Sequence, residues 1–224
     1  MLDLYAGTWE GQPLAPDDCL LSADEKTSIQ ARVRCHPATP PRPGQAMRVE
    51  HEYARGGALA YLAAWDVRHG RVVGRCEATT GIASFGRLVA QVMAQEPYRS
   101  APRVFWVVDN GSSHRGDAAA QRLRAQYPNL ILVHLPVPAS WLNQIAIFFS
   151  IVQRKVLTPN DFPDLPAVEQ RLLAFETLYN DTAVPFNWRF TRADLERRLR
   201  QLPADLGPAA PRSEPLAPAR PLAA

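Results

Sequence analysis

The sequence predicts an α/β fold: a mixed β-sheet flanked by helices, with a proline-rich arm between the first two strands. Three observations support this. Runs of β-branched and aromatic residues, of which 104–108 is the most apolar, alternate with segments of helical periodicity. Acidic residues follow two of the apolar runs, at Asp24 and Asp109. Residues 35–48 contain four prolines and therefore predict a loop or extended arm.

The expected elements follow in chain order. The first strand, 19–21, is expected to stop at the polar and acidic segment 22–25. A hairpin is expected around the His69-Gly70 turn, followed by alternating helices and strands. The remaining expected strands are 57–67, 71–76, 104–109 and 130–135. The expected helices are 82–95, 115–126, 140–157, 165–180 and 191–201.

The organisation predicted from these elements is one domain with two irregular ends. Residues 1–16 are expected to form an irregular lead-in, and 17–201 the domain itself. Residues 202–224 contain six prolines among many alanines, which predicts a disordered tail.

Composition limits the classes of protein to consider. The formal net charge is only +3, which argues against a strongly basic nucleic-acid tail. The three cysteines have no CxxC spacing, so neither a disulfide framework nor a zinc ribbon is expected. The longest apolar run has eight residues and acids interrupt the first twenty, so we expect no membrane partner, no signal peptide and a cytoplasmic protein.

Asp24 and Asp109 are the first candidates for chemistry because each follows an apolar run. If the two strands are neighbours, both carboxylates emerge at the same sheet edge and can share a divalent cation. The alternative is structural: Asp109 forms an Asx turn with Asn110 and Gly111, and Asp24 caps the segment that follows it. The residues alone leave both interpretations open.

Five ordered motifs between Ser22 and Arg198 give the chain a recognisable pattern. The sequence resembles transposases of bacterial insertion sequences related to the mariner group, which are DDE superfamily endonucleases with an RNase H-like catalytic domain. The motifs are Ser22-Ala23-Asp24-Glu25-Lys26-Thr27-Ser28-Ile29-Gln30-Ala31, His51-Glu52-Tyr53, Val108-Asp109-Asn110-Gly111-Ser112-Ser113-His114, Ser140-Trp141-Leu142-Asn143-Gln144 and Phe148-Phe149-Ser150-Ile151-Val152-Gln153-Arg154-Lys155.

The resemblance implies cleavage and strand transfer of DNA with two Mg²⁺ (or Mn²⁺) ions held by three carboxylates. Asp24 and Asp109 match the first two ligand positions, whereas the position of the third, a glutamate in the family, is Ala146 here. At helical spacing Ala146 shares a stripe with Asn143, Ser150 and Gln153, and it alone has no polar group. We therefore expect weak metal binding and slow or absent DNA cleavage.

No other acid is expected to replace the missing carboxylate. Asp117 is expected in a different helix, and Asp161 and Asp164 lie at or beyond the far end of the helix that carries Ala146.

The resemblance also implies DNA contacts, and each has an ordinary structural alternative. His114 can touch phosphate or simply cap its loop, and Trp141 can stack on DNA or anchor the core. Arg154 and Lys155 can contact phosphates or form a solvated helix end. The expected DNA-binding residues are Lys26, His114, Trp141, Asn143, Arg154 and Lys155.

The expected partners are transposon-end DNA, target DNA and a second copy of the chain. The second copy would dimerise through the arm at 35–55; the alternative is that this arm is a simple solvated loop.

Only 23 residues precede Asp24, too few for the helix-turn-helix units of the family, so a catalytic-domain fragment or a split or truncated reading frame is expected. The competing interpretation is a catalytically dead DNA-binding or dimerising module derived from a transposase.

Overall fold

The computed structural model describes residues 1–48, 52–111, 117–136 and 139–201. The chain divides into two compact units: residues 1 and 3–188 form the first, and residue 2 with 189–224 forms the second. The expected domain, 17–201, shares 17–188 with the first unit. The expected tail, 202–224, lies outside the described residues.

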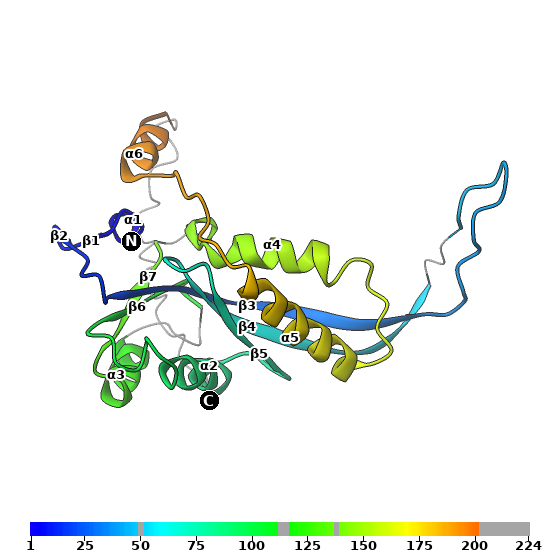
Figure 1. The fold of residues 1–224 in the computed structure, drawn as a ribbon, viewed down its shortest axis with the longest axis horizontal. Coiled ribbons are helices and arrows are strands. Elements are labelled where there is room, and N and C mark those ends of the chain that lie inside the picture. The colour runs from blue at the N-terminus through cyan, green and yellow to red at the C-terminus, as the bar shows by residue number, and fades with distance from the viewer. Residues whose placement is uncertain (49–51, 112–116, 137–138, 202–224) are drawn as a thin grey trace, which may run out of the picture. The chain divides into compact units, whose positions relative to one another are not determined.

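A five-stranded mixed sheet forms the centre of the first unit, as predicted, with the strand order β5-β4-β3-β6-β7 (Figure 1). β4 pairs antiparallel with both β3 and β5, while β6 and β7 continue the sheet in parallel to β3. The strands are β3 (Cys19–Arg34), β4 (Tyr53–Asp66), β5 (Val72–Glu77), β6 (Val104–Val108) and β7 (Leu130–His134).

Helices cover both faces of this sheet, because residues along each strand alternate between two cores. Leu21, Ala23 and Val108 face the core formed with α2 (Ile82–Met93) and α3 (Asp117–Gln126). The opposite core is formed with α4 (Ile145–Lys155) and α5 (Leu165–Asp181). In that core the ring of Trp65 stacks on Phe186 at 4.1 Å between centroids.

The first long strand differs from its prediction, because β3 continues through the acidic segment where it was expected to stop. It pairs with β4 as far as Arg34, where it is opposite Tyr53. Beyond Lys26 several of its side chains are exposed, so polar residues are tolerated there and the sequence loses the apolar signal of a strand. Two register shifts interrupt this pairing, between Lys26 and Ile29 and between Gln30 and Arg32.

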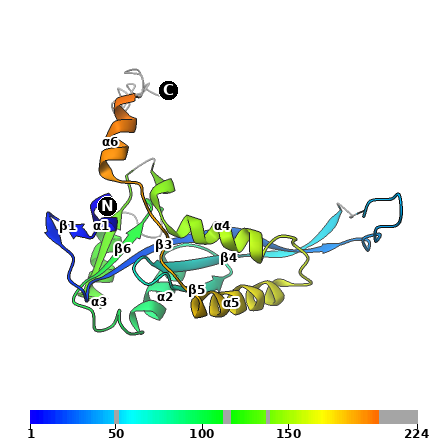
Figure 2. The same ribbon diagram turned by 45° about the horizontal axis from the view of Figure 1, so that its top comes forward.

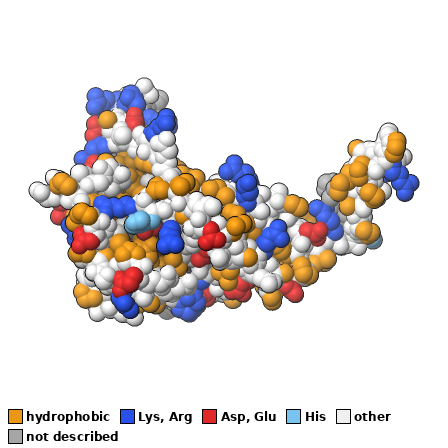
Figure 3. Space-filling model, in the orientation of Figure 1, with side chains coloured by type: hydrophobic (Ala, Val, Ile, Leu, Met, Phe, Trp, Pro, Cys, Tyr) orange, Lys and Arg blue, Asp and Glu red, His pale blue; other side chains and the backbone are white. Residues whose placement is uncertain are grey.

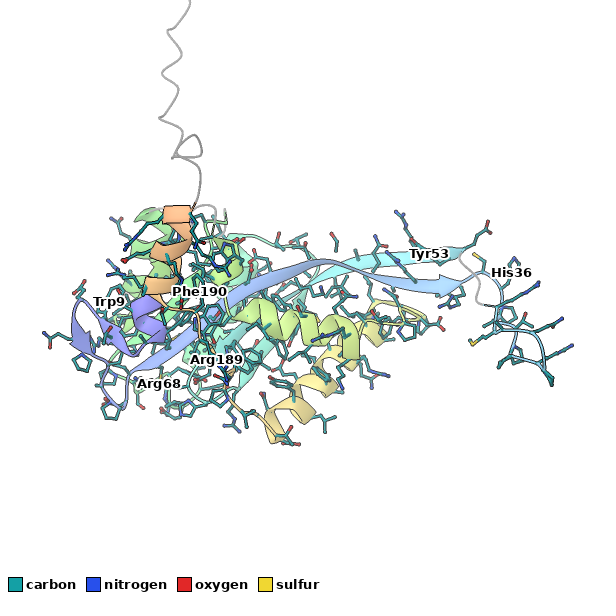
Figure 4. All side chains as sticks on the ribbon, turned by 90° about the horizontal axis from the view of Figure 1, so that it is seen from above. Trp9, His36, Tyr53, Arg68, Arg189 and Phe190 are labelled. Atoms are coloured by element: carbon teal, nitrogen blue, oxygen red, sulfur yellow. The ribbon has the colours of Figure 1, made fainter. Side chains whose placement is uncertain are left out.

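The proline-rich segment forms an arm that extends the β3–β4 ribbon, as Figures 1 and 2 show in blue to cyan. Two isolated antiparallel bridges, Thr39 with Arg48 and Arg42 with Gln45, hold its two sides together. At its base the Arg32 guanidinium lies over the Tyr53 ring, 4.4 Å from the centroid. Figure 4 places Tyr53 toward the end of the ribbon and His36 further out on the arm.

The lead-in is more ordered than the sequence predicted. It contains the short helix α1 (Leu2–Tyr5) and a hairpin of β1 (Thr8–Trp9) and β2 (Gln12–Pro13). Gly7 and Gly11 adopt positive φ angles of 84° and 79°, which a glycine accommodates without strain and which permit the two tight turns. Trp9 then packs against Phe105, with their rings 5.2 Å apart.

The described part of the second unit contains one helix, α6 (Arg192–Gln201). Thr191 and Asp194 cap its start reciprocally: the Thr191 backbone N–H donates to Asp194 Oδ2 at 2.9 Å and the Asp194 N–H donates to Thr191 Oγ1 at 3.3 Å.

Candidate active site

Asp24 and Asp109 lie at the same level of two neighbouring parallel strands. The pairing of β3 with β6 ends at Ser22 opposite Val107, and each aspartate lies two residues further along its own chain. Ala23 and Val108, which precede the aspartates, face the α2–α3 core. Because successive side chains alternate, both carboxylates belong to the opposite face, which α4 and α5 cover.

The electrostatics of Asp24 reflect this placement. The pKa of Asp24 is raised to about 7, mainly by burial and in part by the nearby charges of Asp109 and Glu25. The Glu25 backbone N–H donates to Asp24 Oδ1 at 2.8 Å, which opposes the rise by stabilising the carboxylate. The two aspartates are therefore close enough to repel one another, and a bound cation would relieve that repulsion.

Asp109 also forms the Asx turn considered above. Its Oδ1 accepts a hydrogen bond from the Gly111 backbone N–H at 2.7 Å. The Asn110 Nδ2 donates to the Leu135 carbonyl at 2.5 Å, which ties this turn to the end of β7. Asp109 lines a cavity of about 280 Å³ that extends toward Ser140. The structural role and a metal-binding role of Asp109 are thus compatible, because the same carboxylate can form the turn and face a cation.

The segment expected as one helix, 140–157, is interrupted. A 3₁₀ turn, η1 (Ser140–Leu142), precedes α4, and between them Asn143 adopts an extended conformation with a ψ of 113°. Asn143 is 1% exposed, so it is not available to DNA, contrary to the prediction. Its Nδ2 donates to the Ala23 carbonyl at 2.9 Å and its Oδ1 accepts from the Ser22 hydroxyl. Asn143 therefore positions the start of α4 against β3.

Ala146 lies in the first turn of α4 and is exposed, as are Ser150 and Gln153 of the predicted stripe. It lines a cavity of about 420 Å³ together with Lys26 and Arg154. Burial lowers the pKa of Lys26, so its ammonium is partly removed from water. The described residues that line this cavity include two cations and no carboxylate, so they lack the oxygen ligands that Mg²⁺ prefers.

The other predicted residues fall in different places. Trp141 is 51% exposed on η1, which favours a surface role over a core anchor. Lys155 is exposed at the end of α4, and Asp164 caps α5 by accepting from the Ala167 N–H at 2.8 Å. His114 lies outside the described residues. Across 1–48, 52–111, 117–136 and 139–201, no three His, Cys, Asp or Glu side chains are grouped to hold a metal ion.

Sequence reasoning missed Ser22, whose hydroxyl connects two parts of the site. Ser22 Oγ accepts from the Ile145 backbone N–H at 2.9 Å and donates to Asn143. A serine within the apolar run that begins at Cys19 is the one available signal, since a polar group buried in a strand needs a partner.

The fold is similar to those of several solved structures. The pre-cleavage Mos1 transpososome matches at a TM-score of 0.51 and 18% identity, over 70% of this chain and 48% of that chain. The Mos1 mariner paired-end complex with Mn matches at 0.49 and 18% identity, over 73% of this chain and 49% of that chain. The simian T-cell lymphotropic virus intasome in complex with PP2A regulatory subunit B56 gamma matches at 0.49 and 14% identity, over 98% and 69%.

This chain spans about half the length of the Mos1 chains that it matches. No curated protein sequence matches it significantly. None of the helices in its described part has the length and apolar character to cross a bilayer.

The family model described as DDE superfamily endonuclease matches residues 19–169. The match begins at the first residue of β3 and ends within α5, so it contains Asp24, Asp109 and the position of Ala146. It covers 151 of the 224 residues. Together with the mixed sheet flanked by helices, this match shows that the chain belongs to the DDE superfamily endonucleases.

Proposed function

We propose that this chain is the catalytic portion of an insertion-sequence transposase, with DNA phosphodiesters as its substrate. The observation that supports this proposal is the placement of the two aspartates on adjacent parallel strands. Asp24 lies two residues beyond Ser22 on β3, and Asp109 lies two residues beyond Val107, the partner of Ser22 on β6. This arrangement gives one concentrated negative site on the α4 face of the sheet, beside a partly desolvated Lys26. A site of this kind suits a divalent cation on one side and a phosphate on the other.

Asp24 and Asp109 are the residues that would hold Mg²⁺ or Mn²⁺. Their carboxylate oxygens are the ligands these hard cations prefer. Burial first, and the charges of Asp109 and Glu25 second, raise the pKa of Asp24, and a cation would favour its charged form. When bound, such an ion supplies electrostatic stabilisation of the oxygens at the phosphorus undergoing substitution. The protein holds the two carboxylates side by side on adjacent strands and fixes the start of α4 against β3.

The described residues fit one such ion better than the two that the family resemblance implies. Ala146, at the third ligand position, has no oxygen to offer, and Lys26 and Arg154 border its cavity. We propose that binding of two ions, and hence DNA cleavage, is impaired in this chain. Figure 3 shows basic side chains dispersed over the face formed by β3, β4, α4 and α5, with no single basic patch, so DNA binding is expected to be modest and salt-sensitive.

The test is nicking of supercoiled plasmid in Mg²⁺ or Mn²⁺ by the unchanged chain and by its Ala146→Glu variant. We expect little cleavage by the former and a gain in the latter, with Asp109→Asn in the Ala146→Glu background as the inactive control. Equal and robust cleavage by the unchanged chain and the variant would refute the impairment, while Asp109-independent cleavage would refute the site.

A second candidate function is a catalytically dead module that binds DNA or a partner chain. The proline-rich arm favours it, because it projects beyond the sheet and offers a surface for a second copy. Mixed with an active full-length relative, such a chain should reduce transposition, and removal of residues 36–51 should abolish that reduction. Light scattering of both forms measures whether the arm is needed for a dimer.

A further inference from the structure

A further cavity lies beyond the candidate active site, between the bulged part of β3 and the end of α4. Its volume is about 330 Å³, the lower end of the range for ligand sites. The described residues of its lining are mostly polar, with two basic side chains and no acidic one. They include Lys26, Ser28, Gln30, Arg32, Gln153 and Asn160.

The backbone of β3 is distorted at this cavity. Ser28 has a φ of +57°, in the left-handed region that residues other than glycine seldom adopt. The register of β3 against β4 shifts between Lys26 and Ile29. Such bulges turn side chains away from a regular ladder and are frequent next to functional sites. Here the bulge is part of the cavity wall.

The polar groups of the cavity are fixed in place. Asn160 Nδ2 donates to the Gln30 carbonyl at 2.8 Å, and Arg32 Nε donates to Gln30 Oε1 at 3.1 Å. The other end of the Asn160 amide, Oδ1, is buried and has no hydrogen-bond partner within the described ranges. The hydrogen bond to Gln30 orients the Arg32 guanidinium, and together with the Lys26 ammonium it gives the cavity two positive charges that suit a phosphate.

The cavity adjoins the one beside Ala146, because Lys26 and Gln153 line both. Ser28 lies four strand residues beyond Asp24, roughly 13 Å at about 3.3 Å per residue. Successive phosphates of one strand are further apart than the axial rise of about 3.4 Å per nucleotide, because the backbone also winds around the helix axis, so this distance spans only a few nucleotides. A strand with one phosphate near Asp24 can therefore place another in this cavity.

We infer that this cavity binds a backbone phosphate of DNA a few nucleotides from the phosphate at Asp24. The inference rests on the proposed function, since it assumes that DNA lies across Asp24 and Asp109. A free nucleotide offers the same phosphate chemistry, but the shared wall of the two cavities favours a continuous strand.

The sharpest test is a pair of substitutions at one position, Ser28→Asp and Ser28→Asn. Both residues tolerate the left-handed φ of this position and are similar in size, so they differ mainly in charge. Binding of a short fluorescein-labelled DNA duplex is measured by anisotropy at low salt. We expect Ser28→Asp to weaken binding about fivefold, from the repulsion of unit charges near 4 Å in water, and Ser28→Asn to leave it unchanged.

Arg32→Gln provides a second variant, with Arg171→Gln on the exposed surface of α5 as the matched control. Loss of one phosphate contact lowers the slope of log affinity against log salt by about 0.9. We expect this decrease for Arg32→Gln and not for Arg171→Gln. Thermal unfolding of all four variants shows whether they fold. If Arg32→Gln does not fold, the comparison of Ser28→Asp with Ser28→Asn still tests phosphate binding in the cavity.

Three results would overturn the inference. If neither Ser28→Asp nor Arg32→Gln changes the affinity for the duplex, the DNA does not contact this cavity, and the proposed function is unaffected. Calorimetric binding of deoxyadenosine monophosphate that is sensitive to Ser28→Asp, combined with insensitive duplex binding, assigns the cavity to a free nucleotide. Failure of the unchanged chain to bind any duplex contradicts the proposed function itself.

Discussion

The Asn143 side-chain amide donates to the Ala23 carbonyl at 2.9 Å, and Ala23 immediately precedes Asp24. The residues are 120 positions apart in the chain, and both are fully buried. The hydrogen bond fixes the beginning of α4 against the part of β3 that carries the first aspartate. The position of Ala146 relative to Asp24 is therefore set by a side-chain contact as well as by packing of the helix.

Replacing Asn143 with alanine should destabilise the protein by about 2–4 kcal/mol, because the Ser22 hydroxyl and the Ala23 carbonyl lose a buried partner. Urea unfolding measures the loss. Ser150→Ala, an exposed residue of the same helix, is the control and should stay within about 0.5 kcal/mol. Equal effects of the two substitutions would show that Asn143 has no special positioning role.

The strands most readily predicted were those buried on both faces. β6 and β7 appear in the sequence as unbroken apolar runs, and the structure confirms them within one residue. The continuation of β3 past Asp24 could not be predicted in this way, because the ribbon beyond Lys26 is partly exposed and its side chains are mostly polar. Its extent is determined by pairing with β4, which is a non-local property.

The features of the candidate site that depend on the ends of strands could be predicted from the sequence. Those that depend on hydrogen bonds between distant elements could not. Asp24 and Asp109 share the same sheet face and electrostatic environment, as expected from their positions after apolar runs. The break at Asn143 was missed, since apolar spacing continues through it and its cause is a contact with Ser22 and Ala23 on another element. Local periodicity contains no information about such a contact.

The raised pKa of Asp24 predicts that stability depends on pH in the absence of metal. The folded state holds the proton up to about pH 7, while the unfolded chain releases it near pH 4, so stability falls as pH rises between these values. The loss has an upper bound on the order of 4 kcal/mol, at 1.36 kcal/mol per unit of pKa.

Asp24→Asn tests this pH dependence because the amide has no proton to lose. In EDTA, the melting temperature of the unchanged chain relative to that of Asp24→Asn should be lower at about pH 8 than at about pH 5. The difference between the two proteins isolates Asp24 from the other titrating groups. A difference that is constant with pH would mean that Asp24 titrates near its ordinary value.

Ala146→Glu should strengthen Mn²⁺ binding, because it adds a third carboxylate on the helix next to β3. The position is exposed, so the free energy of unfolding should change by no more than about 0.5 kcal/mol. Electron paramagnetic resonance of free Mn²⁺ measures the affinity without requiring cleavage. Ser150→Glu, one turn further along the same exposed stripe, is the matched control and should bind no more tightly than the unchanged chain. Equal gains in both variants would indicate a general charge effect.

Trp141→Ala should weaken DNA binding and leave the stability of the fold nearly unchanged. The indole is 51% exposed on η1, next to the cavity that Ser140 and Asp109 line, so it can stack on an unpaired base. Stacking of a base on an aromatic ring contributes about 1–3 kcal/mol, which predicts a loss of roughly fivefold or more in affinity for single-stranded DNA. Trp141→Phe should retain much of the affinity, because it keeps an aromatic face.

Anisotropy with a labelled oligonucleotide measures DNA binding by these variants, and urea unfolding measures their stability. Unchanged DNA affinity accompanied by a loss of several kcal/mol in stability would instead assign Trp141 to anchoring of η1.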